Sequence, residues 1–411
     1  MNQKYDTIVI GAGMVGVSTA IHLLQKGRNV LLLDKAGIAK QTSYGNSGII
    51  ESSYVLPFPP PHWSNIPKIM LGKTPYARIN YPDGLSQIPW MLDFYWQSRT
   101  SARIKSGAAM RPLVQNATAE HAMIMEPAGA SQYVSDNGRI KLHRTEESFD
   151  KGEHERHILK QYGVPFEVLS TDQMREIEPD IKPDFFRAIR LTNSKRYTNP
   201  ARAIQAAAKW FTEQGGEYVN ETVKSLRKNN DDWCVNEHQC KSVVICAGPW
   251  SNDLLKPLGH KFPFGVKRGY HKHYQSEVNI KHAIVDADNG YLICPMEQGI
   301  RITTGAEFAA MNTEPDPSQI DLVLPKAKQL VDLGQAVEEE AWMGTRPCLA
   351  DSLPIIGQSH KHPGLWFNCG HGHCGITAGP ASGRLVAELI TGEKPFCNPA
   401  PYTPLRFRGG S

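Results

Sequence analysis

One segment near the N-terminus, Thr7-Ile-Val-Ile-Gly-Ala-Gly-Met-Val-Gly16, predicts how the chain begins to fold. Its first four residues are a β-branched run of the kind found in buried strands. Gly11, Gly13 and Gly16 follow with GxGxxG spacing and lead into a helical pattern that reaches Lys26. In such a strand-turn-helix unit the glycines permit a tight turn close to a pyrophosphate, and the N-terminus of the helix faces the phosphates. The segment therefore predicts a dinucleotide site.

The residue that ends the second predicted strand supports the same site. The run from Asn29 to Leu33 has strand character, and Asp34 follows it, 18 residues past Gly16. A carboxylate at this place accepts a hydrogen bond from a ribose 2′-hydroxyl and disfavours a 2′-phosphate, so NADP is not expected. The fingerprint alone leaves NAD and FAD open.

Composition and charge narrow the class of protein. The 411 residues are 40% hydrophobic and 21% charged, which is usual for a soluble globular protein of about two domains. The net charge is +4 and the basic residues are dispersed, so nucleic acid is not an expected partner. The eight cysteines form no CxxC pair and no spacing typical of a metal site, which favours buried thiols in a reducing cytosol and no bound metal. Because no signal-peptide pattern and no run of ~20 apolar residues is present, we expect a cytoplasmic protein.

Local patterns predict further elements along the chain. Residues 54–99 are rich in proline and tryptophan, and the prolines exclude long regular elements until about Ile88. Asn199 as an N-cap, with Pro200 in the first turn, predicts a helix that ends before Gly215. The other predictions are helices over 90–103, 112–125 and 317–338 (the last as a hairpin or one long helix), strands over 138–142 and 222–226, a buried strand from Ser242, and an antiparallel sheet over 262–308. The nucleotide-binding pattern thus recurs at the start, the middle and the C-terminus, which predicts a discontinuous domain with the active site at its junction with a second domain.

Five blocks of sequence resemble the D-amino-acid oxidase superfamily of FAD oxidoreductases, and within it the bacterial D-amino-acid dehydrogenase-like proteins. The blocks are Gly11–Gly16 with Asp34, Thr42–Ile49, Val243–Ser251, Gly344–Gly357, and Phe367–Thr377 leading into Arg384, and the closing Pro401–Phe407 is similar too. The resemblance implies an α/β fold with a discontinuous, Rossmann-like FAD-binding domain of the glutathione-reductase type. It also implies a second, α+β substrate domain built on a mainly antiparallel sheet. The implied boundaries are 1–85, 186–256 and 340–411 for the FAD-binding domain and 86–185 and 257–339 for the substrate domain.

The same resemblance implies FAD, bound without a covalent link, as the cofactor. It places residues 43–48 along the pyrophosphate and flavin, the backbone near Val223 at the adenine, and residues 370–375 at the pyrimidine edge of the flavin ring. A helix starting near Ile376 or Thr377 would aim its positive end at that ring, where negative charge collects on reduction. The cofactor-binding residues expected from the fingerprint and the resemblance are Gly11, Ala12, Gly13, Met14, Val15, Gly16, Asp34, Lys35, Thr42, Ser43, Asn46, Ser47, Gly48, Ile49, Val223, Ala247, Gly248, Trp250, Gly344, Arg346, Gly370, His371, Gly372, His373, Gly375, Ile376 and Thr377.

Oxidation of an amino acid needs a clamp for its carboxylate, and the planar fork of arginine suits that task. The resemblance implies Arg346 as the carboxylate-binding residue, and the alternative for Arg346 is an inter-domain ion pair. It implies Arg268 as a second substrate-facing arginine, and the alternative for Arg268 is a solvated position on a sheet. It implies that Tyr291 lends a hydroxyl to the carboxylate, against the alternative of a core tyrosine with a hydrated tip. Tyr54 is a candidate for a lid over the substrate or for plain packing.

Three further residues near these blocks invite a chemical role. His371 and His373 are expected to act mainly through their backbone, so that hydride transfer proceeds without a dedicated protein base. Cys348 lies near the block in which some sarcosine-oxidising relatives attach flavin, but its spacing to Asp351 is shorter than at that site. We therefore expect non-covalent FAD.

The expected activity is FAD-dependent oxidative deamination of an amino acid, in particular a D-amino acid. Hydride transfer from Cα to flavin N5 gives an imino acid, which water converts to a 2-oxo acid and ammonia. Oxidation of glycine, sarcosine or a D-proline derivative is the alternative. A tRNA-modifying FAD protein and a non-catalytic flavoprotein subunit are more remote alternatives, because no methyltransferase domain fits and Arg346 is retained.

The resemblance to dehydrogenases also bears on the electron acceptor. It implies a quinone or the respiratory chain as an acceptor, besides oxygen. The segment from Tyr54 to Trp96, with Lys68, Lys73 and Arg78, is then either a peripheral contact with the inner face of the cell membrane or an aromatic lid over the active site.

Overall fold

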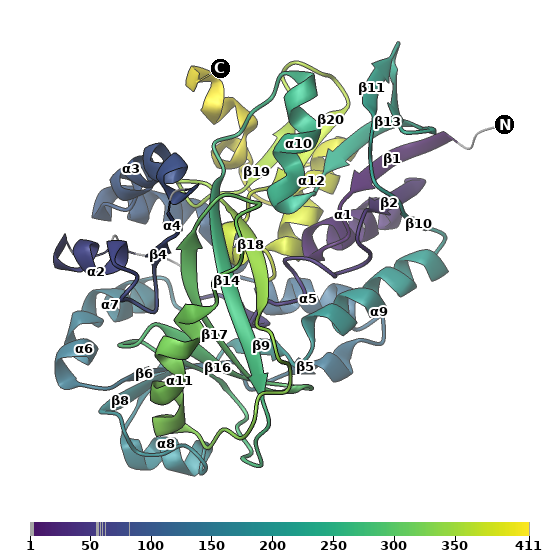
Figure 1. The fold of residues 1–411 in the computed structure, drawn as a ribbon. Coiled ribbons are helices and arrows are strands. Elements are labelled where there is room, and N and C mark those ends of the chain that lie inside the picture. The colour runs from purple at the N-terminus through teal and green to yellow at the C-terminus, as the bar shows by residue number, and fades with distance from the viewer. Residues whose placement is uncertain are drawn as a thin grey trace.

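The structure, a computed structural model, describes residues 4–54, 57, 59, 61, 63–81 and 83–410. Parts of the proline-rich segment, among them Pro60 and Pro82, lie outside the described residues. Two large sheets and the helices around them make up the described chain (Figure 1). The N-terminal strand lies beside yellow C-terminal elements, so the two ends of the sequence contribute to the same part of the molecule.

The first sheet carries the predicted nucleotide-binding strands. Its order is β10 (Glu217–Asn220), β2 (Val30–Asp34), β1 (Lys4–Ile10), β13 (His238–Ile245), β12 (Asp232–Val235) and β11 (Leu226–Asn229). Beside β13 also lies β20 (Leu365–Cys369), which pairs in turn with β19 (Ile355–Gln358). The pairs β10–β2, β2–β1, β1–β13 and β13–β20 are parallel, so strands from the start, the middle and the end of the sequence share one parallel core.

Helices with small or apolar faces cover this sheet. α1 (Met14–Gln25), α5 (Ala117–Met125), α9 (Pro200–Glu213) and α12 (Gly379–Thr391) bury their apolar sides in one hydrophobic core with β1 and β2. At Gly383 of α12 a Cβ atom would lie 2.8 Å from the backbone carbon of Ser18, so the two helices approach closely only because that position is glycine. The predicted N-cap of α9 is confirmed, because the Asn199 side chain accepts the backbone N–H of Arg202 at 3.1 Å.

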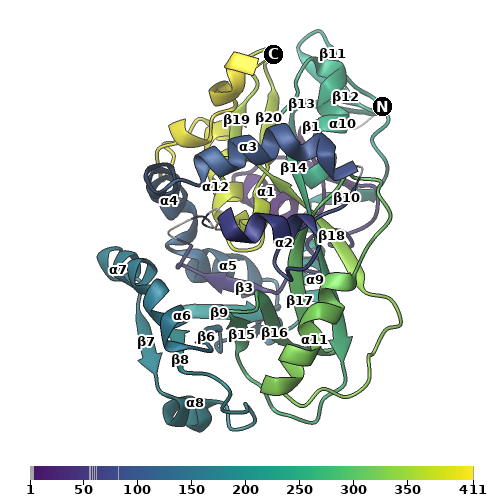
Figure 2. The same ribbon diagram turned by 60° about the vertical axis from the view of Figure 1, so that its left-hand side comes forward.

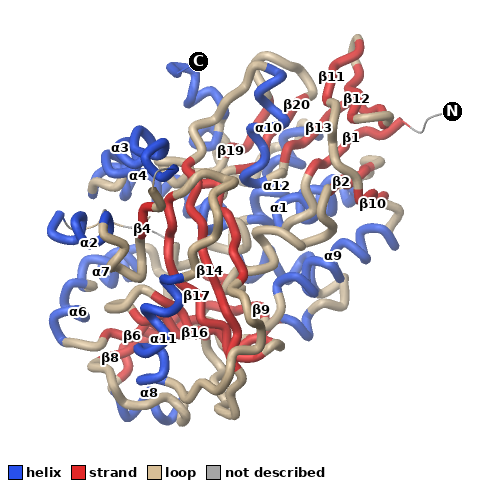
Figure 3. Tube along the Cα trace, viewed as in Figure 1, coloured by secondary structure: helices blue, strands red, loops and turns tan. Residues whose placement is uncertain are grey.

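The second sheet is mainly antiparallel, as expected. Its order is β18 (Trp342–Cys348), β14 (Gly265–Tyr274), β17 (Gly299–Phe308), β16 (Tyr291–Met296), β15 (Ala283–Asp286), β6 (Arg139–His143), β8 (Arg187–Leu191) and β7 (Phe166–Leu169), and β4 (Arg78–Ile79) pairs with β17. The long strands β14 and β17 run through the middle of the molecule (Figure 3). A second core under α11 (Ser318–Leu330) fills one face of this sheet. The fold class expected from the sequence is therefore confirmed.

The remaining elements lie between and beside the two sheets. β3 (Ile49–Glu51), β9 (Ser194–Tyr197) and β5 (Val134–Ser135) form a small third sheet. The other helices are α2 (Ile66–Met70), α3 (Ile88–Gln97), α4 (Thr100–Val114), α6 (Glu146–Lys151), α7 (Glu153–Gln161), α8 (Thr171–Ile177) and α10 (Ser251–Leu255). Figure 2 shows α2 and α3 at the front of the molecule, with α3 next to α4 and in front of β14.

Two predicted elements are wrong in extent. The strand predicted over 222–226 begins only at Leu226, as β11. The Asn236 side chain accepts the backbone N–H groups of Lys224 and Ser225, at 2.9 and 3.1 Å, and so removes them from any ladder. The helix predicted over 317–338 ends at Leu330, because the chain beyond it pairs with the end of β14, where Val337 N–H donates to the His273 carbonyl at 2.9 Å.

Smaller differences affect other helix ends. The predicted break near residue 103 falls at 98–99, between α3 and α4, and α4 continues through Pro112. The helix predicted near Ile376 begins at Gly379. The domain boundaries stay a prediction, and β8 and β18, which lie inside the predicted FAD-binding segments, are hydrogen-bonded within the second sheet.

Candidate active site

A cleft of about 300 Å³ opens at the carboxyl ends of the parallel strands of the first sheet. It extends from Asp34 and Val223 past the glycine-rich turn to the glycines of 370–375. Sixteen of the expected cofactor-binding residues line it, namely Gly11, Gly13, Met14, Val15, Asp34, Lys35, Thr42, Ser43, Val223, Ala247, Gly248, Trp250, Gly370, His371, Gly372 and Gly375. The cleft thus gathers four segments that are far apart in the sequence.

The glycine-rich turn leaves no room for side chains. Gly11 has φ +112°, and a Cβ atom there would lie 2.4 Å from the carbonyl oxygen of Cys246. At Gly16 a Cβ atom would lie 1.7 Å from the Gly11 carbonyl oxygen, so α1 starts in direct contact with the turn. The N-terminus of α1, whose partial positive charge suits a phosphate, is therefore held at the cleft.

Asp34, the last residue of β2, forms hydrogen bonds that stabilise the glycine-rich turn. Its carboxylate accepts the backbone N–H of Ala12 at 2.7 Å and those of Ala36 and Gly37 at 2.7 and 3.1 Å. The Asp34 side chain also lines the cleft. Glu221, whose backbone N–H donates to the Asp34 carbonyl at 2.9 Å, lines the cleft beside it and was not predicted.

The loop after β2 is held from both sheets. Ser43 Oγ accepts the backbone N–H of Met14 at 3.1 Å, and Thr42 Oγ1 donates to the Thr345 carbonyl of β18 at 2.8 Å. From β17, Arg301 donates to the Asn46 carbonyl at 2.6 Å. This loop therefore connects the glycine-rich turn to the second sheet, as expected for a segment that wraps a ligand.

The far end of the cleft is built from β20 and the turn before α12. Asn368 lines the cleft, and its buried Oδ1 has no hydrogen-bond partner among the described residues. His371 is fixed by a 2.9 Å hydrogen bond between Nε2 and Ser382 Oγ, and burial lowers its pKa to about 3. His371 is therefore neutral at ordinary pH.

Eleven of the expected cofactor-binding residues do not line the cleft within the described part of the chain. They are Ala12, Gly16, Asn46, Ser47, Gly48, Ile49, Gly344, Arg346, His373, Ile376 and Thr377. Ala12 and Gly16 act on the turn through their backbone, as described above. Ile376 and Thr377 face the interior, where their carbonyl groups contact His121 Nε2 at 3.0 and 3.3 Å.

Arg346 lies on the other side of β18 from the cleft-lining Pro347. Its guanidinium packs over Gly269, where a Cβ atom would lie 2.3 Å from Nη2, and Nη1 donates to the Gly305 carbonyl at 3.1 Å. No carboxylate of the described residues pairs with Arg346. The alternative of an inter-domain ion pair therefore has no support, and the guanidinium keeps donors for a ligand.

Lys267 was not predicted and lies directly opposite Arg346 in the β14–β18 ladder. It is buried, and its Nζ lies 3.7 Å from the centre of the Phe94 ring and 5.0 Å from that of Trp90. Burial lowers the pKa of Lys267, and the charge of Arg346 lowers it further. A buried and a half-buried cation thus face the same space beneath α3.

Arg268 has a different environment from its neighbour. It is fully buried, and its guanidinium pairs with Glu307 at 2.7 Å and donates to the carbonyl groups of Thr313 and Glu314. Tyr270 donates to the same Glu307 carboxylate. This geometry is that of a structural residue of the sheet, and it does not support the expected substrate-facing role of Arg268.

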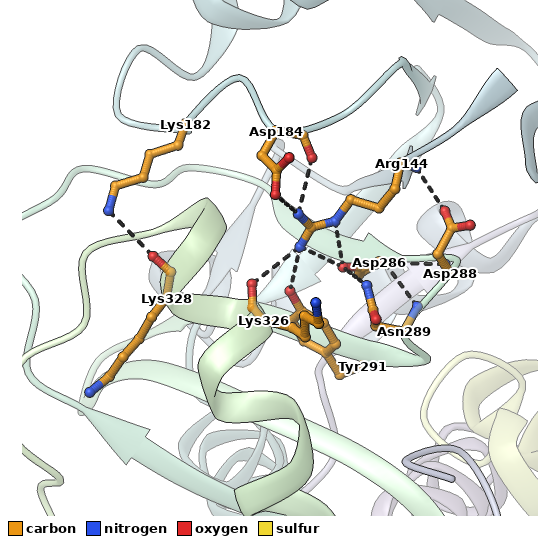
Figure 4. Close-up of polar contacts among 9 residues, drawn as sticks. All are labelled: Arg144, Lys182, Asp184, Asp286, Asp288, Asn289, Tyr291, Lys326 and Lys328. Carbon is orange, nitrogen blue, oxygen red and sulfur yellow. Dashed lines mark hydrogen bonds and ion pairs between the residues drawn. The ribbon is translucent and has the colours of Figure 1, made fainter.

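Tyr291 belongs to a polar cluster on the side of α11 (Figure 4). Its fully buried hydroxyl accepts a hydrogen bond from Arg144 at 3.3 Å, and Arg144 also pairs with Asp286 at 2.9 Å. Burial and Asp286 raise the pKa of Tyr291. The Tyr291 hydroxyl therefore points toward Arg144 and supports the alternative of a core tyrosine.

Three other candidates remain, of which His373 and Cys348 lie close to Arg346. Burial raises the pKa of Tyr54 well above 10, and the Tyr54 hydroxyl hydrogen-bonds Ser352 and Cys374. Burial, together with the charges of Arg346 and Lys267, lowers the pKa of His373 well below 6.5. Burial raises the pKa of Cys348, which keeps the thiol protonated and a poor nucleophile for covalent attachment.

One further group of side chains has the composition of a metal site. Ligand atoms of His271, His273 and Glu338 lie within 4.8 Å of one another. However, Arg301 Nε donates to His273 Nε2 at 3.0 Å, and His273 Nδ1 donates to Glu338 at 2.7 Å. Both ring nitrogens of His273 are thus engaged and a buried cation adjoins them, which favours a hydrogen-bonded chain that supports Arg301.

The cleft fits FAD by its shape and by its donor set. The positive-φ turn at Gly11 presents backbone N–H groups, Asp34 stands at one end, and the unpaired Asn368 Oδ1 stands near the other. Lys35 Nζ lies 4.1 Å from the Trp250 ring centre across the same cleft. These residues would hold FAD, which would supply a hydride acceptor at the cleft.

Comparison with known proteins agrees with this description. A family model described as DAO, FAD dependent oxidoreductase, matches residues 6–389. A D-amino-acid oxidase of Bradyrhizobium diazoefficiens is 27% identical over 424 residues, which cover 99% of this chain and 100% of the relative. A D-amino acid dehydrogenase of Azorhizobium caulinodans is 29% identical over 414 residues, with 94% and 96% covered. Among solved structures, glycine oxidase from Geobacillus kaustophilus superposes with a TM-score of 0.73 at 21% identity and covers 98% of each chain.

Proposed function

The chain belongs to the DAO family of FAD dependent oxidoreductases, and we propose that it oxidises the Cα–N bond of a D-amino acid. The observation that carries this proposal is Arg346, half-buried on β18 next to the cleft-lining Pro347, with no carboxylate partner among the described residues. The two relatives named above act, by their names, on D-amino acids and match nearly the whole chain.

In the proposed reaction the residues around the cleft bind the substrate and exclude water, and none of them transfers a proton. Arg346 binds the substrate carboxylate, because a guanidinium forms paired, charge-assisted hydrogen bonds with it. When bound, FAD accepts the hydride that leaves Cα. Tyr54 and the rings of α3 cover the substrate and exclude water. His371 and His373, both neutral, contribute no proton transfer, so the substrate enters with its amine already neutral. Water then converts the imino acid to a 2-oxo acid and ammonia.

Glycine, sarcosine and D-proline derivatives are the alternative substrates, and one experiment separates them from D-amino acids. The purified flavoprotein is mixed anaerobically with a panel of D-amino acids, L-amino acids, glycine, sarcosine and D-proline derivatives, and the loss of oxidised-flavin absorbance is followed. We expect the fastest reduction with a D-amino acid. Faster reduction by an L-amino acid, or no reduction by any compound, would overturn the proposal.

The carboxylate role of Arg346 is tested with a matched pair of variants. Arg346→Ala should lose about 2 to 5 kcal/mol of transition-state binding, because it removes a charge-assisted pair from a buried site. Arg202→Ala removes an arginine that pairs with Glu297 on the surface and serves as the control. If Arg346→Ala reduces its flavin as readily as the parent at low substrate, another group binds the carboxylate.

We also propose a membrane quinone as the electron acceptor, reached at the outer faces of α2 and α3. The residues of this patch are Ile66, Met70, Leu71, Ile88, Leu92, Tyr95 and Trp96, all exposed, with Lys68 and Lys73 exposed beside them. Figures 1 and 2 both place α2 and α3 on the same side of the molecule. Arg78 takes no part, because it pairs with Asp316. No helix within the described residues is long and apolar enough to cross a membrane.

Vesicle binding tests this patch. Leu71 and Leu92 are 68% and 66% exposed, so the double change Leu71→Ser with Leu92→Ser should lower pelleting with anionic vesicles. Leu322→Ser changes an exposed leucine of α11 and is the control. Absence of pelleting by the parent, or quinone reduction that survives the double change, would end the membrane proposal while leaving the amino acid oxidation intact.

A further inference from the structure

Two cations beneath α3 point the same way, and we call the space that they face the pocket beneath α3. Lys267 of β14 and Arg346 of β18 are register partners, so their side chains leave the sheet on the same face. Two glycines of β14 make the space. At Gly265 a Cβ atom would lie 2.2 Å from the Trp90 ring, and at Gly269 it would meet the Arg346 guanidinium. In the pattern Gly265-x-Lys267-x-Gly269, the lysine therefore lies between two positions that have no side chain, and Trp90 and Arg346 occupy the space at those positions.

The charges of this pocket are not balanced by the described residues. Lys267 Nζ contacts the faces of Phe94 and Trp90 and forms no hydrogen bond or ion pair with any described residue. Arg346 donates to one backbone carbonyl. His373, the titratable neighbour of both, is neutral, and the Cys348 thiol is protonated. A buried charge is costly unless it is paired, so the buried, unpaired Lys267 beside the half-buried Arg346 favours an anionic ligand at this place.

We propose that Lys267 binds a second carboxylate of the substrate, so that the enzyme acts on amino acids with an acidic side chain. This inference rests on the proposed oxidation of an amino acid and names its substrate class. A single α-carboxylate on Arg346 leaves the Lys267 ammonium unpaired, whereas a dicarboxylate neutralises both cations. The rings of Trp90 and Phe94 lie against the Lys267 ammonium and keep water away, which strengthens an ion pair that the ammonium forms.

A comparison of acid and amide substrates of equal size tests whether the enzyme recognises the negative charge of the substrate side chain. The ratio of kcat/KM for D-glutamate to that for D-glutamine, and for D-aspartate to D-asparagine, is measured with a soluble electron acceptor. We expect both acids to be preferred at least tenfold. Equal values, or a preference for the amides, would overturn the inference even if D-amino acids are oxidised.

Variants assign the preference to Lys267. Lys267→Met keeps the apolar stem and removes the charge, and it should lower the acid-to-amide ratio at least tenfold, whereas Lys267→Arg should restore much of it. Lys272→Met is the matched control, since Lys272 lies on the same strand and its Nζ bonds the Glu339 carbonyl at the surface. A ratio unchanged in Lys267→Met would reject the assignment, provided that thermal melting shows the variant folded.

A binding measurement separates this inference from the proposed activity. Succinate has two carboxylates and succinamate has one, and neither carries an amine to oxidise. We expect succinate to raise the melting temperature of the parent more than succinamate does, and this difference to vanish in Lys267→Met. A difference that persists in the variant would exclude Lys267. Failure of every amino acid to reduce the flavin would refute the proposed function without altering this result.

Discussion

Lys267 and Arg268 are adjacent in the sequence and have opposite surroundings. Successive side chains of a strand point to opposite faces, so Lys267 faces the pocket beneath α3 while Arg268 enters the core beside Glu307. A resemblance identifies the segment but does not determine which face a residue takes when a bulge, here between Arg268 and Tyr270, alters the register. The pair of glycines around Lys267 is the signal in the sequence that points to the pocket.

The buried ion pair of Arg268 leads to a stability prediction. Glu307→Gln leaves the fully buried guanidinium without its counter-charge and should lower the free energy of unfolding by about 3 to 5 kcal/mol. Glu297→Gln, which removes the partner of Arg202 from a half-exposed pair, should cost about 1 kcal/mol or less. Urea unfolding of both variants measures the difference, and equal losses would show that Glu307 is not a structural counter-ion.

A glycine substitution tests the cofactor turn. Gly11→Ala should lose FAD during purification, because φ is +112° and the new methyl group would meet the Cys246 carbonyl. Gly215→Ala is the control: its φ is +96° and no atom lies within 4 Å of the new methyl group. We expect the control to cost about 1 kcal/mol of stability from backbone strain and to retain its flavin. Flavin absorbance per mole of protein measures retention, and equal retention would remove the turn from the cofactor site.

At the scale of elements, strands and helices with local signals were predictable and those fixed by distant side chains were not. β1, α1 and the cap of α9 follow from residues within a few positions of one another. The strand expected over 222–226 begins only at Leu226 because of Asn236, and the helix after Leu330 ends because its chain joins β14. The glycines around Lys267 are a local signal for space at this strand, but Trp90 and Phe94, which line it, lie more than 170 positions earlier and belong to no local pattern.

The helix α3 has two faces with separate tasks, which leads to a third prediction. Phe94 lies under the helix against Lys267, whereas Tyr95 is 48% exposed on the outer side. Phe94→Ala removes a cation–π contact of about 0.5 to 2 kcal/mol and opens the pocket to water, so kcat/KM with a soluble acceptor should fall about 2- to 30-fold. Tyr95→Ala should leave that value unchanged. Steady-state kinetics measures kcat/KM for both variants. Equal effects of Phe94→Ala and Tyr95→Ala would mean that α3 does not cover the substrate.

For the whole molecule, the buried histidines predict a loss of stability in mild acid. Burial lowers the pKa of His22 and His121 to about 4 and that of His371 to about 3. A folded-state pKa below the unfolded value of about 6.5 means that the unfolded chain binds protons first, so stability is complete above pH of about 6.5 and falls as the pH drops toward 4. For each such histidine, the free energy of unfolding falls by about 1.4 kcal/mol for every pH unit by which the pH drops within this window.

One pair of variants measures this contribution. His121→Gln, studied by urea unfolding between pH 7 and 5 at a fixed FAD concentration, should reduce the slope of stability against pH by about one proton. His154→Gln changes an exposed histidine and should leave the slope as it is in the parent. An unaltered slope in His121→Gln would mean that His121 is already protonated in the folded protein.

The strand β18 has a consequence for how this enzyme can be redesigned. Because Pro347 lines the cofactor cleft while Arg346 points to the side of Lys267, β18 presents alternate residues to the cofactor cleft and to the proposed substrate site. Random libraries restricted to positions 344, 346 and 348 would vary the substrate side and leave the cofactor side in place. An insertion of one residue would exchange the two sides, and an insertion of two would restore their order. Natural variation in length at this strand should therefore come in even steps.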